Sequence, residues 1–193
     1  MAITSPKSWT FTGKVVDFAD DRRRCDCCER PGMRFGCQVQ TKGKGAADQK
    51  YTAYVGMDCL FDNGFQLPED WANTDLQLRR SELLREATHR ALVRELIALE
   101  KTLKALDWAK EISLARLISS VQKHKLLSPK QALFLLSMVE RSGHDFPLSL
   151  IRITTRTNRW RDQLAELSSE DAGRLDPYLT TSQKRWITQN AAD

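Results

Sequence analysis

The residues of this chain whose types and spacing could do chemistry are its five cysteines, which all fall in the first third of the sequence. Cys25 and Cys28 form a C-x-x-C pair, a spacing that lets two thiolates from one turn reach the same metal ion. Four thiolates around one ion form the closed tetrahedral shell of a structural zinc site. The pattern therefore predicts a structural zinc. The cysteines are Cys25, Cys27, Cys28, Cys37 and Cys59.

Two other interpretations of these cysteines are disulfide bonds and ordinary buried thiols. The sequence begins without the apolar segment of a secretory signal, and no apolar run approaches the roughly 18 residues that span a membrane. We therefore expect a cytoplasmic protein, whose thiols stay reduced and favour metal over cystine. An odd number of cysteines would also leave one thiol outside any set of bridges.

The elements that must position the cysteines have the composition of strands. The residues around Cys37 alternate apolar and polar, which places Cys37 on the apolar face of its strand. Cys59 lies on a predicted short helix that ends at Asn63 and Gly64. The predicted elements are strands over 8–18, 33–40 and 50–56 and a helix over 57–62.

A cysteine knuckle, a hairpin and a helix-borne cysteine follow one another in the order of a treble-clef zinc finger. The usual finger carries two ligands on its helix as C-x-x-C, but the first of those positions is Gly56 here. Cys37 is then the first candidate for the fourth ligand. The alternative is that Cys37 only faces the core, and that Cys27 or a water molecule fills the fourth place. The predicted ligand set is Cys25, Cys28, Cys37 and Cys59.

The sequence after residue 65 has a helical character. Residues 66–74 predict a linker between a zinc-binding, β-rich module over 1–65 and a helical bundle over 75–193. Leucine and alanine recur at helical spacing from Leu76 to Leu106, which predicts one long helix. The predicted fold class is therefore α+β, with a small treble-clef-like zinc finger followed by a mainly α-helical bundle.

Local start and stop signals predict the remaining helices. Ser128 is a predicted N-cap, with Pro129 at the first helical position and Gln131 three residues after the cap. Gly143 is a typical glycine after a helix end. The other predicted helices cover 107–123, 147–167, 169–175 and 181–189.

The net charge is +5, and the segment from Phe146 to Arg161 contains four arginines and no acidic residue. On a continuous helix Arg152, Arg156 and Arg159 would share one face, where like charges repel each other. Guanidinium groups beside small hydroxyl side chains suit phosphate oxygens, so we expect contact with a nucleic-acid backbone. The other interpretation is a solvated helix face. The candidate nucleic-acid-binding residues are Arg22, Arg23, Arg24, Lys42, Lys44, Arg152, Arg156, Arg159 and Arg161.

The motif Cys25-x-x-Cys28, followed by Met33-Arg34-Phe35 and then by Val55-Gly56-x-x-Cys59, resembles zinc-finger proteins of bacterial mobile elements. A small cysteine finger followed by a basic helical bundle is also similar to the zinc-finger-bearing large subunit of type IV CRISPR effector complexes. This resemblance implies contacts to guide RNA and to duplex DNA beside the target sequence. The motif itself covers only residues 25–59.

Two classes of function follow from these observations. We expect a non-catalytic subunit that binds RNA or DNA, within a larger ribonucleoprotein such as a CRISPR effector complex and beside other protein subunits. The alternative is a protein-interaction adaptor or anti-defence factor of a phage or plasmid. We expect no enzyme with a small-molecule substrate, because the sequence shows no recognised catalytic constellation and no phosphate-binding glycine loop. We expect no membrane partner, because no apolar run is long enough to span a membrane.

Overall fold

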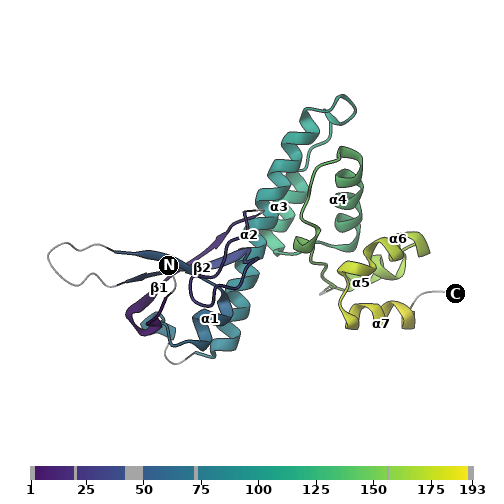
Figure 1. Ribbon diagram of the computed structural model, residues 1–193. Coiled ribbons are helices and arrows are strands. Elements are labelled where there is room, and N and C mark those ends of the chain that lie inside the picture. Colours follow the sequence, from purple (N-terminus) through teal and green to yellow (C-terminus); the bar gives the residue numbers. More distant parts are fainter. Residues whose placement is uncertain (1–2, 20, 42–49, 72–73, 156, 191–193) are drawn as a thin grey trace. The chain divides into compact units, whose positions relative to one another are not determined.

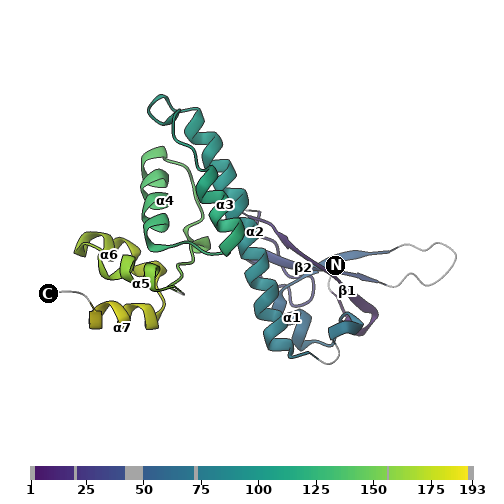
Figure 2. The same ribbon diagram turned by 180° about the vertical axis from the view of Figure 1, so that it is seen from behind.

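The computed structural model describes residues 3–19, 21–41, 50–71, 74–155 and 157–190. The chain divides into two compact units, Met1–Thr88 and His89–Asp193. The first unit contains the strands and the second is helical, so the fold is a mixed α+β fold (Figures 1 and 2). The long helix α2, Leu76–Lys104, begins in the first unit and ends in the second.

The first unit is built on a three-stranded antiparallel sheet in the order β1-β2-β3. A register shift in β1 between Phe11 and Val15 surrounds Gly13, whose φ of 79° lies in the region that favours glycine. The strands agree with the sequence prediction apart from one or two residues at their ends. They are β1 (Trp9–Asp17), β2 (Phe35–Thr41) and β3 (Thr52–Val55), and the short helix α1 (Met57–Asp62) follows.

One face of the sheet forms the core of the first unit. Phe11, Val39 and Val55 are buried there, together with Leu60 of α1. The described part of 66–74 packs on the same unit, because the Gln66 backbone N–H donates to the Trp9 carbonyl at 2.9 Å. Trp71 extends this packing, with its ring 5.6 Å from that of Phe11 and 6.4 Å from that of Phe61.

The second unit contains a buried stripe of leucines on α2, and its helix α4 contacts α5 and α6. Leu92, Leu96, Leu99 and Leu103 recur at helical spacing, and each is almost completely buried. This stripe confirms the long helix that the sequence predicts. The other helices of this unit are α3 (Ala115–His124), α4 (Pro129–Ser142), α5 (Asn158–Ala165), α6 (Ser169–Leu175) and α7 (Thr181–Asn190).

The start and stop signals of α4 act as predicted. The Ser128 hydroxyl accepts the Gln131 backbone N–H at 3.3 Å, and the Gln131 side chain accepts the Ser128 N–H at 2.9 Å. Gly143 ends the helix at a φ of 64°. The prediction for 107–123 is wrong at its start, because 107–109 form a single 3-10 turn and the regular helix begins at Ala115.

The predicted helix over 147–167 is wrong in its first half, whereas α5 (Asn158–Ala165) lies within its second half. Residues 148–150 form one 3-10 turn, Ile151 is extended and Ile153 forms an isolated bridge with Leu127, and α5 begins only at Asn158. The extended backbone pairs with Leu127, which donates to the Arg152 carbonyl and accepts from the Thr154 N–H, each at 3.0 Å. These tertiary hydrogen bonds, together with β-branched Ile, Thr and Thr at 153–155, outweigh the helical pattern. Arg152 therefore does not share a helix face with Arg159.

Candidate metal centre

The loop between β1 and β2 carries three of the cysteines in a tight turn. Its two ends are joined where Arg23 and Met33 exchange backbone hydrogen bonds of 3.1 and 2.9 Å. Within the loop, the Cys25 N–H donates to the Arg30 carbonyl at 3.0 Å, and the Glu29 N–H donates to the Cys25 carbonyl at 2.8 Å. Glu29 has a φ of 60°, which turns the chain back. The loop is thus a closed knuckle held by its own backbone.

Asp26 fastens this knuckle to the outer edge of β3. Its carboxylate accepts the Tyr54 N–H at 2.7 Å, and its own N–H donates to the Tyr54 carbonyl at 3.0 Å. Its carbonyl accepts the Ile3 N–H at 2.7 Å. Asp26, which lies between Cys25 and Cys27, therefore positions the knuckle. An aspartate within a turn is a sequence signal for a side-chain hydrogen bond to the backbone. The sequence alone does not show which backbone group it binds.

The helix α1 completes a group of three cysteines. The Sγ atoms of Cys25, Cys28 and Cys59 all lie within 4.8 Å of one another, and this group could hold a metal ion. Cys25 and Cys59 are buried, whereas Cys28 is exposed. The Gly56 backbone N–H donates to the Cys25 sulfur at 3.2 Å, which ties the start of α1 to the knuckle. Three of the four predicted ligands are therefore together.

The electrostatics of the group fit a bound cation. Burial raises the pKa of Cys59, and its contacts with the thiols of Cys28 and Cys25 raise that pKa further. The Arg30 backbone N–H instead lowers the pKa of Cys28, with help from hydrogen bonds to Cys59 and Cys25. Gathering several thiolates in one place is unfavourable without positive charge between them. A divalent cation supplies that charge.

The two remaining cysteines lie outside this group. Cys37 stands on β2, opposite Val15 and Val55, and is 0% exposed. Burial raises the pKa of Cys37 to about 12. Cys27 is partly buried against the core of the first unit, and burial raises its pKa although a hydrogen bond with Cys59 opposes this. Cys37 as the fourth ligand stays a prediction, as does its alternative, Cys27.

A cavity of about 310 Å³ opens beside the three thiols. Met33 and Pro31 supply apolar wall, and Arg30 and Asn63 supply hydrogen-bond donors. The carboxylate of Asp58 also lines the cavity and is paired with the Arg80 guanidinium. Its lining is Cys25, Cys28, Arg30, Pro31, Gly32, Met33, Gly56, Asp58, Cys59, Asp62 and Asn63.

The arginines before the knuckle are exposed on its surface. Arg22 and Arg24 are exposed, and the Arg23 guanidinium lies over the Phe18 ring at 4.9 Å and the Tyr54 ring at 5.7 Å. These cation–π contacts give Arg23 a structural partner. The predicted candidates Lys42 and Lys44 lie outside the described residues.

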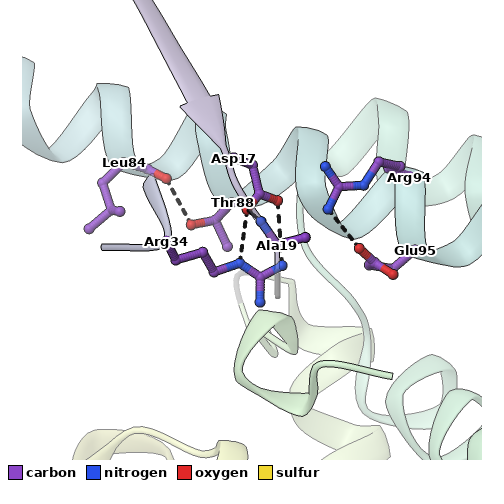
Figure 3. A network of polar contacts seen from close by, with 7 residues as sticks. All are labelled: Asp17, Ala19, Arg34, Leu84, Thr88, Arg94 and Glu95. Atoms are coloured by element: carbon purple, nitrogen blue, oxygen red, sulfur yellow. Dashed lines mark hydrogen bonds and ion pairs between the residues drawn. The ribbon is translucent and has the colours of Figure 1, made fainter. Parts of the chain in front are cut away.

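Arg34, which belongs to the Met33-Arg34-Phe35 motif, forms a well-buried ion pair with Asp17. Its Nε lies 3.1 Å from Oδ1 of Asp17, with the two side chains 13% and 10% exposed. The same Asp17 oxygen accepts the Ala19 N–H at 2.9 Å (Figure 3). The pair joins the end of β1 to the residue before β2, at the base of the knuckle loop.

Three of the predicted nucleic-acid-binding arginines of the second unit are described and exposed, one on a non-helical segment and two on a helix. Arg152 lies on the non-helical segment, while Arg159 and Arg161 lie on α5. The Arg161 Nε donates to the Thr155 carbonyl at 3.2 Å. Among the described residues, no acidic side chain forms an ion pair with any of these three arginines. Arg156, the fourth, lies outside the described residues.

Comparisons with known proteins add no relative, since no protein-family model, no curated protein and no solved structure matches this chain. Among the helices of the described residues, none is long and apolar enough to cross a membrane.

Proposed function

We propose that the first unit is a treble-clef-like zinc finger whose metal joins the knuckle to α1. Three convergent thiols carry this proposal, because zinc binds well to clustered soft sulfur ligands such as cysteine thiolates. The order of knuckle, antiparallel β2–β3 pair and α1 supports the treble-clef description. Zinc would stabilise a unit whose own core is small.

Elemental analysis of protein purified without added metal tests the zinc proposal. We expect about one zinc per chain in the wild type and much less in Cys25→Ser and Cys59→Ser, since each variant removes one of the three gathered ligands. Cys28→Ser should behave alike, although Cys28 is exposed. A zinc content near zero in a folded wild-type protein contradicts the proposal.

We further propose that the protein is a non-catalytic, nucleic-acid-binding subunit that contacts the phosphate backbone. The observation that supports it is the set of exposed arginines, Arg152, Arg159 and Arg161, which have no acidic partner among the described residues. Arg22 and Arg24 add exposed positive charge beside the knuckle. Because these groups carry charge without a base-reading arrangement, their binding should depend little on nucleotide sequence.

A salt titration separates this proposal from the adaptor function. Binding of duplex DNA and of RNA is measured at several salt concentrations for the wild type and for a triple variant, Arg152→Gln, Arg159→Gln and Arg161→Gln. Loss of three duplex phosphate contacts should lower the salt slope by about 2.7, at 0.9 for each contact. The resemblance to effector-complex subunits makes guide RNA the first RNA to test.

A matched control is the triple variant Arg85→Gln, Arg90→Gln and Arg116→Gln, which changes the net charge equally at other exposed helix positions. It should lose clearly less affinity than the first triple variant. Equal losses would mean that overall charge alone drives binding. If the wild-type protein binds neither DNA nor RNA, alone or in a complex with which it copurifies, the adaptor function replaces this proposal.

A further inference from the structure

We propose that the metal centre keeps an exchangeable fourth coordination position, which faces the cavity and accepts a small thiol from outside the chain. This inference rests on the zinc proposed above and adds a binding property to it. It also departs from the sequence expectation of a closed shell of four protein thiolates.

The first observation is the number of ligands that the fold brings together. Within the described residues, the group that could hold a metal contains Cys25, Cys28 and Cys59, each offering one sulfur within 4.8 Å of the others. Zinc prefers four ligands, and centres with three protein ligands complete the shell with water or another small molecule. One position of the shell is thus left for a ligand from elsewhere.

The second observation places that position on the cavity side. The three thiols line the cavity of about 310 Å³, whereas neither Cys27 nor Cys37 belongs to its lining. Gly56 lies in the same wall, where a Cβ atom would meet no heavy atom within 4 Å. Position 56, where a treble-clef finger usually carries its third cysteine, therefore has no side chain, and the space that such a side chain would enter is open.

The lining of the cavity favours a small sulfur ligand. Met33 and Pro31 can contact a short carbon chain, and the Arg30 guanidinium offers positive charge to a thiolate. The Asp58 carboxylate is already paired with Arg80, which reduces its repulsion of an incoming anion. In the exchange, the thiol loses its proton to solvent, its sulfur binds the metal and the water molecule held there leaves.

The experiment uses the full-length protein loaded with cobalt(II), which reports its sulfur ligands through charge-transfer absorbance. It compares the wild type with Gly56→Ala and Gly56→Cys, purified with a phosphine reductant so that no free thiol is present. Gly56 has φ −64° and ψ 155°, a conformation open to any residue, so both variants should fold. The alanine variant adds the Cβ without a sulfur atom and is the matched control.

We expect β-mercaptoethanol to raise the charge-transfer absorbance of the wild type and of Gly56→Ala by about a third at saturation, as four sulfur ligands replace three. Gly56→Cys should show the higher absorbance from the start and should not respond. The bound cobalt should stay near one equivalent throughout.

Three results would overturn the inference. A wild type that already shows the absorbance of Gly56→Cys and ignores the added thiol has a fourth protein ligand, which Cys37→Ser and Cys27→Ser would then identify. Loss of cobalt on addition of the thiol would mean that the thiol removes the metal from the protein and does not join it in the site. A folded wild-type protein that binds neither cobalt nor zinc would contradict the proposed metal centre itself. The other two results would contradict only the open fourth position.

Discussion

Replacing Asp26 by alanine should loosen the knuckle and weaken metal binding. The variant removes a charged hydrogen bond of 2.7 Å to the Tyr54 N–H and leaves that N–H without its acceptor. The two backbone hydrogen bonds of Asp26, to Tyr54 and Ile3, remain. Hydrogen bonds to charged groups contribute about 1.5–3 kcal/mol, and a value near 2 kcal/mol corresponds to a factor of about 30 in an equilibrium constant.

The size of the effect is measured by two assays on the same protein. Denaturant unfolding with zinc present should show a loss of about 2 kcal/mol, provided that the first unit gives a resolved transition. Competition with a chelator should show zinc affinity falling by up to about 30-fold, because metal binding and the order of the knuckle are coupled. Asp26→Asn keeps an acceptor oxygen without the charge and should lose only about half as much free energy.

Asp62→Ala is the matched control for Asp26→Ala. It removes a carboxylate from the wall of the same cavity, at an exposed residue whose side chain forms no hydrogen bond or ion pair within the described residues. We expect its stability to change by less than about 0.5 kcal/mol. If Asp26→Ala matches the wild type in both assays, or if Asp62→Ala weakens zinc binding equally, the positioning role of Asp26 is wrong.

Three further predictions concern the fold. Gly36→Ala would bring a Cβ within 2.6 Å of the Phe18 ring, and should destabilise the first unit by about 1–3 kcal/mol in denaturant unfolding, a result that unchanged stability would refute. Ser128→Ala removes the cap of α4 and should cost about 1 kcal/mol, visible as a thermal midpoint about 2–4 °C lower; an unchanged midpoint would argue against the cap's role. Leu99→Ala, at a completely buried position, should cost about 2–5 kcal/mol, and a loss below about 1 kcal/mol would contradict its place in the core.

Much of the local structure follows from the sequence because its causes are local. The capping box at Ser128 and the glycine at 143 act within one helical turn, and both form as predicted. The leucine stripe of α2 and the alternation around Cys37 reflect the periods of helix and strand, so these elements were also predicted with small errors at their ends. Cys25 and Cys28 could be paired as ligands because a single turn fixes their spacing.

The metal centre as a whole depended on contacts between residues distant in the sequence. Cys59 reaches the knuckle because β2 and β3 pair and return the chain to it, and Asp26 finds its partner at Tyr54 on the edge of β3. The spacing of Cys37 suits both a ligand and a core residue. Cys37 is completely buried on β2 and is not one of the three gathered thiols, so its role as fourth ligand stays a prediction.

The arginine segment shows the same division between local pattern and tertiary structure. Its spacing predicts a helix face, but Leu127 binds the backbone on both sides of Ile153 and holds it extended. The composition and the spacing of the sequence thus determined most helices, the strands and the C-x-x-C pair, since these follow from interactions within a few residues. Tertiary structure decided which cysteines meet, what Asp26 binds and where the arginines lie, because those outcomes depend on hydrogen bonds and packing between segments that no local pattern encodes.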